Sequence, residues 1–174
     1  MNQRSSRSSG KTVALGGVLL ALSVVCLYAA SVVPGVELTM FLASSLLVAV
    51  MMIESRGKGG WLLYGATLVL AFAVVPNKLI IIPYGLFFGL YPVVKSLIER
   101  KFVGKAQIAV KIGFFTAVAI GMIKFAQEIL FGGSVLENAP FIVLLIVGEI
   151  FFLVFDWVLS TLISYYYRRF HGVI

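Results

Sequence analysis

Residues 12–33 read TVALGGVLLALSVVCLYAASVV, an apolar run without a charged side chain that stops at the turn dipeptide Pro34-Gly35. The hydrocarbon core of a bilayer is about 30 Å thick, and an α-helix of about 20 residues crosses it. The run is long enough to span a membrane and too long for the apolar part of a typical secretory signal peptide. The serine-rich residues 1–11 before it predict a disordered tail.

Five further apolar segments follow, and none has the alternating period of a barrel strand. Only helices and closed barrels satisfy their backbone groups inside a bilayer. We therefore predict an all-α, polytopic membrane protein with six transmembrane helices in one bundle over residues 12–167. No internal repeat supports an inverted-repeat transporter. The expected helices cover residues 12–33, 37–53, 61–75, 79–97, 107–131 and 140–167.

The composition of the 174 residues points the same way, because 61% are apolar and 12% are charged, with a mean hydropathy of +1.07. An ordinary soluble domain carries about 25% charged residues, and a small one has too much surface to hide so many apolar side chains. The chain has one cysteine, Cys26, and one histidine, His171. Disulfide scaffolds, zinc sites and Cys–His nucleophiles therefore lack their partners, and no metal or cofactor is expected.

The positive charges favour a membrane orientation over a nucleic-acid partner. Fourteen Lys and Arg against seven Asp and Glu give a net charge of +7. Enrichment of such residues in alternate connections is the positive-inside pattern, which predicts cytoplasmic N- and C-termini, a short C-terminal tail over 168–174 and a multi-pass location in the plasma membrane. An even number of spans agrees. The clustered residues are Arg4, Arg7, Lys11, Arg56, Lys58, Lys95, Arg100, Lys101, Lys105, Arg168 and Arg169.

Two carboxylates, Glu149 and Asp156, lie within the last apolar segment. They are two helical turns apart, so they project from one face. An ionisable group in the hydrocarbon core costs several kcal/mol unless it is paired or hydrated, so Glu149 indicates a ligand pathway or a hydrogen bond to a neighbouring helix. Asp156 lies nearer the cytoplasmic end, where it can hold a helix contact or pair with a loop lysine.

The outer side of the predicted bundle carries two more charged features. Lys124 and Glu128 are one turn apart in the fifth segment, which indicates either a local ion pair or a cation that meets an anionic ligand. The turn Pro76-Asn77-Lys78 precedes the fourth segment, where Lys78 is either a ligand-contacting tip or part of an ordinary polar turn.

The fourth segment is expected to be irregular, because Pro83 and Pro92 each remove an amide donor. Kinked membrane helices often line a cavity. Gly85 and Gly89 form a GxxxG spacing, which also occurs where helices simply pack closely. Aromatic side chains surround the spacing, among them Tyr84, Phe87 and Phe88.

Gly17 and Ala21 form a small-xxx-small pair in the first segment. Such a smooth stripe favours helix association, either within the bundle or with another protein.

The predicted protein resembles the substrate-binding S-components of energy-coupling factor (ECF) vitamin transporters. The shared features are six spans, both termini inside, a first helix with small residues and short loops. A group of uncharacterised bacterial membrane proteins of the same general type is similar over three stretches: ESRGKGGWLLYGATLVLAFAVVPNKL (54–79), YGLFFGLYPVVKSLIERK (84–101) and FDWVLSTLISYYYRR (155–169). The resemblance to S-components implies a vitamin or metal pocket open to the outside. It also implies that Gly17 and Ala21 dock onto a transmembrane coupling protein with ATPase subunits. The His-rich N-terminus of nickel and cobalt members is absent.

The leading hypothesis is therefore a non-enzymatic protein that captures a small solute such as a vitamin for an ATP-driven partner. Its pocket is expected on the outer side between the last three segments, with Lys78, Lys124, Glu128 and Glu149 as polar contacts and Tyr84, Phe87 and Phe88 as the apolar wall. The alternative is a non-transporting scaffold for envelope or lipid-associated partners, which would use Gly17, Ala21 and the basic stretch 99–111. An enzyme acting on lipid through Glu149 and Asp156, and a proton-coupled carrier, remain open at this stage.

Overall fold

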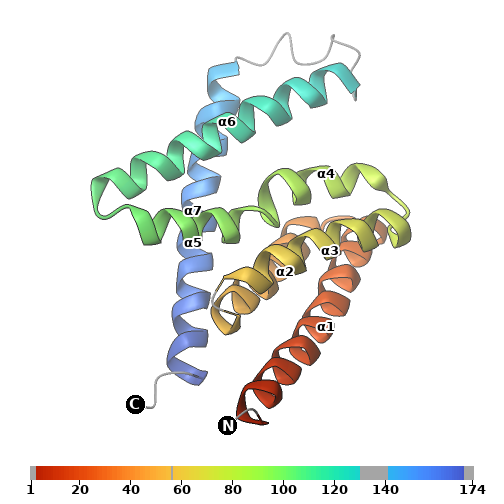
Figure 1. Cartoon of the computed structure of the whole chain (residues 1–174). Helices are drawn as coiled ribbons and strands as arrows, with labels where there is room; N and C mark the ends of the chain where they lie inside the picture. The colour runs from red at the N-terminus through yellow and green to blue at the C-terminus, as the bar shows by residue number, and fades with distance from the viewer. Residues whose placement is uncertain (1–2, 56, 130–140, 171–174) are drawn as a thin grey trace. The chain divides into compact units, whose positions relative to one another are not determined.

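The computed structural model describes residues 3–55, 57–129 and 141–170, and this part of the chain consists of helices and the turns between them, without a strand (Figure 1). The prediction of an all-α protein is confirmed. Two short irregular elements, a 3₁₀ turn η1 and a π-helical turn η2, interrupt the longer helices. In chain order the elements are α1 (Gln3–Val32), α2 (Glu37–Glu54), α3 (Lys58–Val74), η1 (Lys78–Ile80), α4 (Ile81–Pro83), η2 (Tyr84–Phe88), α5 (Tyr91–Lys101), α6 (Lys105–Ile129) and α7 (Phe141–Phe170).

Five helical stretches are long and apolar enough to cross a membrane. The third segment expected to span, residues 61–75, corresponds to α3, a shorter apolar helix of 17 residues. At about 1.5 Å per residue α3 rises about 25 Å, a little less than the hydrocarbon core. The five long stretches are Gly10–Val32, Glu37–Glu54, Lys78–Lys101, Lys105–Met122 and Leu145–Arg169.

The ends of the first and last helices differ from the expected boundaries. Residues 3–11, expected as part of a disordered tail, continue α1 as helix. Extending an existing helix needs no new nucleation, and arginine is a good helix former, so the apolar run can propagate helix into the basic segment. α7 extends to Phe170, past the expected end at 167, while Pro140 and His171 lie outside the described residues.

The chain divides into two compact units, where the sequence predicts a single bundle. Unit 1 comprises residues 1–97 and 162–174, and therefore contains α1 to η2, the first part of α5 and the end of α7. Unit 2 comprises residues 98–161, with the end of α5, α6 and most of α7.

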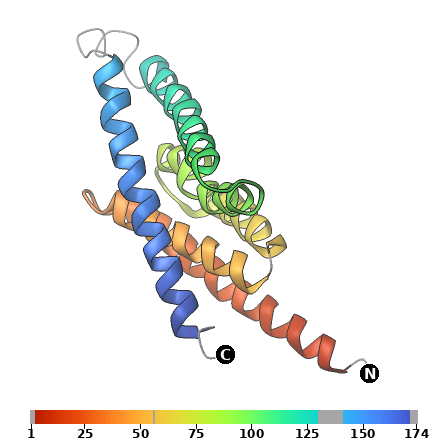
Figure 2. The same ribbon diagram turned by 90° about the vertical axis from the view of Figure 1, so that its left-hand side faces the viewer.

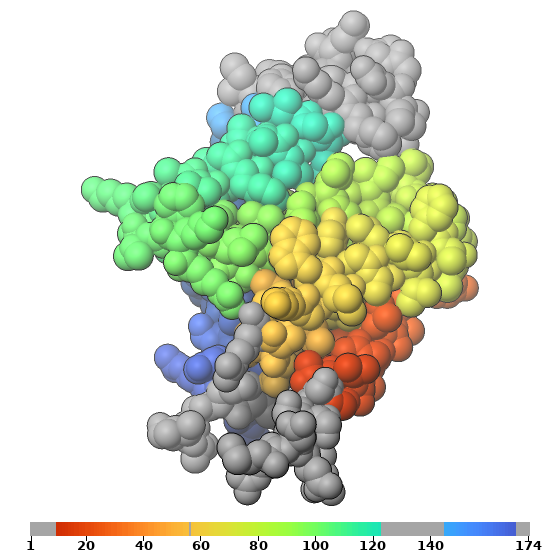
Figure 3. Space-filling view, in the orientation of Figure 1, coloured from red at the N-terminus to blue at the C-terminus, as the bar shows by residue number. Residues whose placement is uncertain are grey.

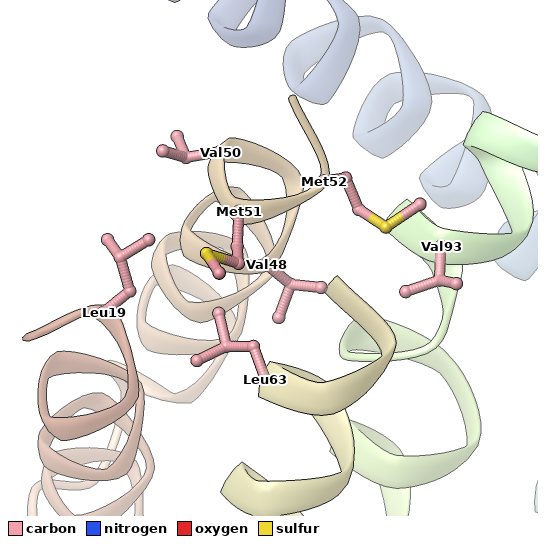
Figure 4. Close-up of a cluster of buried hydrophobic side chains, with 7 residues drawn as sticks. All are labelled: Leu19, Val48, Val50, Met51, Met52, Leu63 and Val93. Carbon is pink, nitrogen blue, oxygen red and sulfur yellow. The ribbon is translucent and has the colours of Figure 1, made fainter. Parts of the chain in front are cut away.

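The core of unit 1 lies where α1, α2 and α3 pack against one another (Figure 2). Figure 4 shows Val48, Met51 and Leu63 meeting between these helices. Glycine brings α2 and α3 close together, because a Cβ at Gly60 would lie 2.1 Å from the Met52 Sδ. The whole cluster contains Leu19, Val48, Val50, Met51, Met52, Leu63 and Val93.

In unit 2, α6 and α7 pack through the stacked rings of Phe115 and Phe152, whose centroids are 4.7 Å apart. Gly148 faces Phe115, and a Cβ there would lie 3.4 Å from the ring. The other side of α7 presents large apolar side chains at its surface, which is compatible with a membrane protein. These exposed residues are Ile146, Val147, Ile150, Leu153, Val154 and Trp157.

Candidate functional site

A groove of about 500 Å³ lies in unit 1 between α1, the end of α2 and the start of α3. Its volume falls within the range of about 300–1,000 Å³ that small-molecule sites occupy. Most of its surface is apolar. We call it the α1–α3 groove, and its lining includes Gly16, Gly17 and Leu20 of α1, Met51 of α2, and Lys58 and Gly59 of α3.

Two of its glycines shape the groove in opposite ways. A Cβ at Gly17 would meet no atom within 4 Å, so the absence of a side chain there leaves open space in the groove. A Cβ at Gly59 would lie 2.6 Å from the Met51 Cε and from the Ser55 side chain, so glycine there lets α3 approach α2. Ala21, the other half of the predicted docking pair, is exposed on the next turn of α1, beyond the lining of the groove.

Lysines mark one end of this groove. The Lys58 side chain is exposed and takes part in no ion pair within the described residues. Lys11, also exposed, directly precedes Thr12, which lines the groove. The groove therefore combines an apolar interior with a positively charged end.

The aromatic residues predicted to form a pocket wall lie in the packed interior of unit 1. Tyr84, Phe87 and Phe88 are 0%, 3% and 5% exposed. Phe88 stacks on Phe41 with ring centroids 4.8 Å apart, and Phe87 stacks on Tyr91 at 5.6 Å. Among the described residues, the buried hydroxyls of Tyr84, Ser44 and Ser23 make no hydrogen bond of good geometry, although the hydroxyls of Ser44 and Thr67 lie near that of Tyr84. A buried hydroxyl without any partner costs about 1–3 kcal/mol, and the neighbouring hydroxyls reduce that cost for Tyr84.

The π-helical turn η2 follows from the prolines that the sequence analysis marked. Pro92 has no amide hydrogen to give to the Phe88 carbonyl four residues earlier, and the Ser45 hydroxyl of α2 lies 2.5 Å from that carbonyl oxygen. The Gly89 amide donates to the Tyr84 carbonyl, which leaves the Gly85 carbonyl free for the Tyr64 hydroxyl of α3 at 2.7 Å. Side chains of α2 and α3 thus satisfy the backbone groups that the distorted helix leaves open.

Lys78 caps the end of α3. Its ammonium group donates to the Val75 carbonyl at 2.8 Å and also to the Phe72 carbonyl, and it lies 5.2 Å from the centre of the Phe72 ring. A cation at a helix C-terminus compensates carbonyls that have no partner within the helix. The Asn77 side chain accepts a hydrogen bond from the Leu79 amide, so the turn is ordered by its own polar groups.

Glu149 and Asp156 both bond α6 within unit 2, as expected for side chains on one face of a helix. The Thr116 hydroxyl donates to Glu149 Oε1 at 2.5 Å. The Lys111 ammonium lies 3.2 Å from Asp156 Oδ2 and 2.8 Å from Glu99 Oε1. The Phe115–Phe152 stack lies between these two polar layers in the sequence of both helices.

The structure does not test whether the residues of the predicted outer pocket form one site. The side chains of Lys124 and Glu128 lie outside those that the structure describes. The other members belong to both units, with Lys78 and the aromatic residues in unit 1 and Glu149 in unit 2. The outer pocket therefore stays a prediction.

Several polar residues that hold the structure together were not singled out from the sequence. Lys111 is 7% exposed and serves two carboxylates, and a lysine inside an apolar segment was a signal that an acidic partner had to exist. Ser45, Tyr64 and Thr116 carry no such signal, because serine, tyrosine and threonine are common in membrane helices whether or not they bond a neighbour.

The described residues contain no group of three or more His, Cys, Asp or Glu side chains placed to hold a metal ion. They offer an apolar groove, buried hydroxyls and paired charges. Comparisons with protein families, with curated proteins and with solved structures give no match to this chain. The resemblance to S-components therefore stays a prediction.

Proposed function

We propose that the chain is a non-enzymatic, multi-pass protein of the plasma membrane with six spans and both termini in the cytoplasm. Five stretches of sufficient length and the shorter α3 support the number of spans. A helix slightly shorter than the bilayer core is tolerated through local thinning and through flanking lysines such as Lys58, which reach the interface. In this orientation the positive end of the α1–α3 groove faces the cytoplasm.

We infer that the protein is an S-component-like subunit that captures a small solute such as a vitamin and docks, through the α1–α3 groove, onto a transmembrane coupling protein with ATPase subunits. The observation that supports docking most directly is the open space in the groove at Gly17. Membrane helices associate where small residues let backbones approach, and a groove without a Cβ accepts a helix of a partner. The docking role of Gly17 and Ala21 comes from the resemblance.

The fully buried Tyr84 hydroxyl supports the solute-capture part of the proposal. It is a hydrogen-bond donor buried in the same unit that contains the groove. A solute that carries an acceptor oxygen or nitrogen would satisfy it.

Photocrosslinking tests the docking. A photoreactive residue replaces Gly17 in one variant and Val25, which is 62% exposed and outside the groove, in the matched control. In native membranes we expect position 17 to capture a coupling protein of the ECF type and position 25 to capture it several-fold less. Equal capture at both positions, or none at 17, contradicts docking through the groove.

Ligand retention tests the capture. Purified protein is exposed to a panel of vitamins and metal ions and examined by native mass spectrometry, with Tyr84→Phe as the variant that removes only the buried hydroxyl. We expect one ligand to be retained and its affinity to fall about 5- to 10-fold in Tyr84→Phe, the loss of one net hydrogen bond. Retention of no ligand across the panel contradicts solute capture.

The second candidate is a non-transporting scaffold or accessory protein for envelope or lipid-associated partners. The largely apolar lining of the groove favours it, because a partner helix needs no polar contacts there. Capture of envelope-assembly proteins from position 17, together with no retained ligand, would establish this candidate in place of the first.

A further inference from the structure

The turn that joins α5 to α6 (Figure 1) combines exposed apolar residues with exposed cations. Phe102 is 39% exposed and Val103 is 88% exposed. Gly104 adopts a φ of +67°, which allows the chain to reverse there and leaves the two apolar side chains at the tip. Figure 3 shows the green segment of the chain that contains this turn at the molecular surface. We call residues 100–105 the basic tip.

Three cations surround the apolar pair. Arg100 and Lys101 end α5, where positive charge agrees with the helix dipole. Lys105 begins α6, where it opposes the dipole, so it does not stabilise that helix and an anion nearby would relieve the conflict. All three side chains are exposed, and none forms an ion pair within the described residues.

The acidic neighbour of the basic tip is already engaged. Glu99 directly precedes Arg100, but its carboxylate lies 2.8 Å from the buried Lys111 ammonium, which also binds Asp156. The Glu99 carboxylate is therefore used in the ion pair with Lys111 and does not neutralise the cations of the basic tip. Three positive charges are left around an apolar pair, without a carboxylate between Arg100 and Lys105.

We propose that the basic tip binds anionic phospholipids of the membrane, with Phe102 and Val103 inserted at the boundary between headgroups and acyl chains and Arg100, Lys101 and Lys105 on lipid phosphates. A polybasic segment beside a membrane helix attracts anionic headgroups. Free phosphate or nucleic acid would match the cations but leaves an 88% exposed valine in water. The proposal rests on the membrane placement above and not on what occupies the α1–α3 groove.

A tryptophan reporter at position 103 tests this proposal. Trp61 and Trp157 are replaced by Phe, Val103→Trp is added, and the protein is reconstituted in vesicles of phosphatidylcholine with one fifth phosphatidylglycerol. Two preparations have the same lipid composition, but bromine quenchers are attached to the glycerol lipid in one and to an equal amount of the choline lipid in the other. We expect clearly stronger quenching from the brominated anionic lipid, corresponding to its several-fold enrichment at the tip.

Charge variants identify what causes the enrichment. Each basic residue near an anionic surface contributes about fivefold in affinity. Arg100→Gln, Lys101→Gln and Lys105→Gln together should therefore abolish the difference between the two preparations. As a positional control, Leu79→Trp, at an exposed site of η1, should show no preference in the same background.

Each contrary result overturns the proposal. Equal quenching from the two labels means apolar contact without anionic selectivity, and no quenching from either means that the tip lies in water or against another protein. Enrichment that persists in the triple variant excludes the cations as its cause. Enrichment relieved by inorganic phosphate at matched ionic strength indicates a site for soluble anions. None of these results bears on crosslinking at Gly17, so the two proposals fail separately.

Discussion

The distorted helix of unit 1 and the α6–α7 pair of unit 2 both carry polar groups among apolar side chains, and they satisfy those groups by different means. Around η2, neutral hydroxyls of Ser45 and Tyr64 bond open backbone carbonyls, and glycines allow the close approach. Between α6 and α7, the Lys111 ammonium bridges two carboxylates. The η2 region of unit 1 therefore depends on shape and neutral hydrogen bonds, although unit 1 also buries the charged Lys95, whereas the α6–α7 pair of unit 2 depends on charge.

This difference predicts which kinds of substitution each unit tolerates. Removing one partner of a buried neutral hydrogen bond leaves the other partner unsatisfied, which costs about 1–3 kcal/mol. A buried charge left without its partner keeps its full desolvation cost. Unit 2 should therefore be sensitive to single charge removals and tolerant of paired ones, while unit 1 should be sensitive to added volume.

The largest expected effect is that of Lys111→Ala, which leaves Asp156 and Glu99 without their cation. Because the Glu99 and Asp156 side chains are 40% and 22% exposed, the loss of the buried cation should cost about 2–3 kcal/mol in the free energy of unfolding, the scale of hydrogen bonds to charged groups. Detergent-denaturation curves of the purified protein measure this loss. Lys111→Arg, the control, should retain most of the stability, and Lys111→Leu with Asp156→Leu should recover much of it. A single variant as stable as the parent would mean that charge does not hold unit 2.

Gly60→Ala tests the role of shape in unit 1. The new methyl group would lie 2.1 Å from the Met52 Sδ, and overpacking of this kind costs about 1–3 kcal/mol. Gly65→Ala is the matched control in the same helix, because a Cβ there would meet nothing within 4 Å and should leave stability unchanged or slightly raised. The same unfolding measurement separates them. Similar results for the two variants would contradict close packing of α2 and α3.

Ser45→Ala tests the hydrogen bond that replaces the missing amide of Pro92. Without the hydroxyl the buried Phe88 carbonyl loses its donor, and we expect a loss of about 1–2 kcal/mol. Pro92→Ala supplies an amide hydrogen at the position where an α-helix would use it, so Ser45→Ala should cost less in that background. A double-mutant cycle with no coupling between positions 45 and 92 would reject this account of η2.

The smallest expected effect is that of Lys78→Met. Loss of a cation at the α3 C-terminus costs about 0.3–1 kcal/mol, and thermal unfolding should shift only slightly. The ligand-retention assay distinguishes a structural role of Lys78 from ligand contact. If Lys78 only caps α3, the affinity for any retained solute should be unchanged in Lys78→Met. A large drop in affinity with unchanged stability would instead support the predicted ligand contact at Lys78.

Some features of the fold could be predicted from single residues of the sequence. Pro83 and Pro92 predicted an irregular fourth segment, and η1, α4 and η2 occupy that place. Glu149 and Asp156 were expected on one face, and both bond α6. The partners could not be predicted, because Lys111 and Asp156 are 45 residues apart in the chain and no local periodicity relates them.

The sequence by itself determined the helical class and the apolar segments, since hydropathy and the need to satisfy backbone groups are local properties of a chain in a membrane. It also predicted cations in the short connections, which was wrong for Lys95, because that residue lies buried inside α5. Only the tertiary structure decided that Gly17 leaves open space in the groove while Gly59 lets α3 approach α2, and that Lys78 caps the preceding helix α3. It likewise decided that Glu99 turns to Lys111 and leaves the basic tip uncompensated. Such outcomes depend on which helices meet and at what distance, and that is set by packing between residues far apart in the chain.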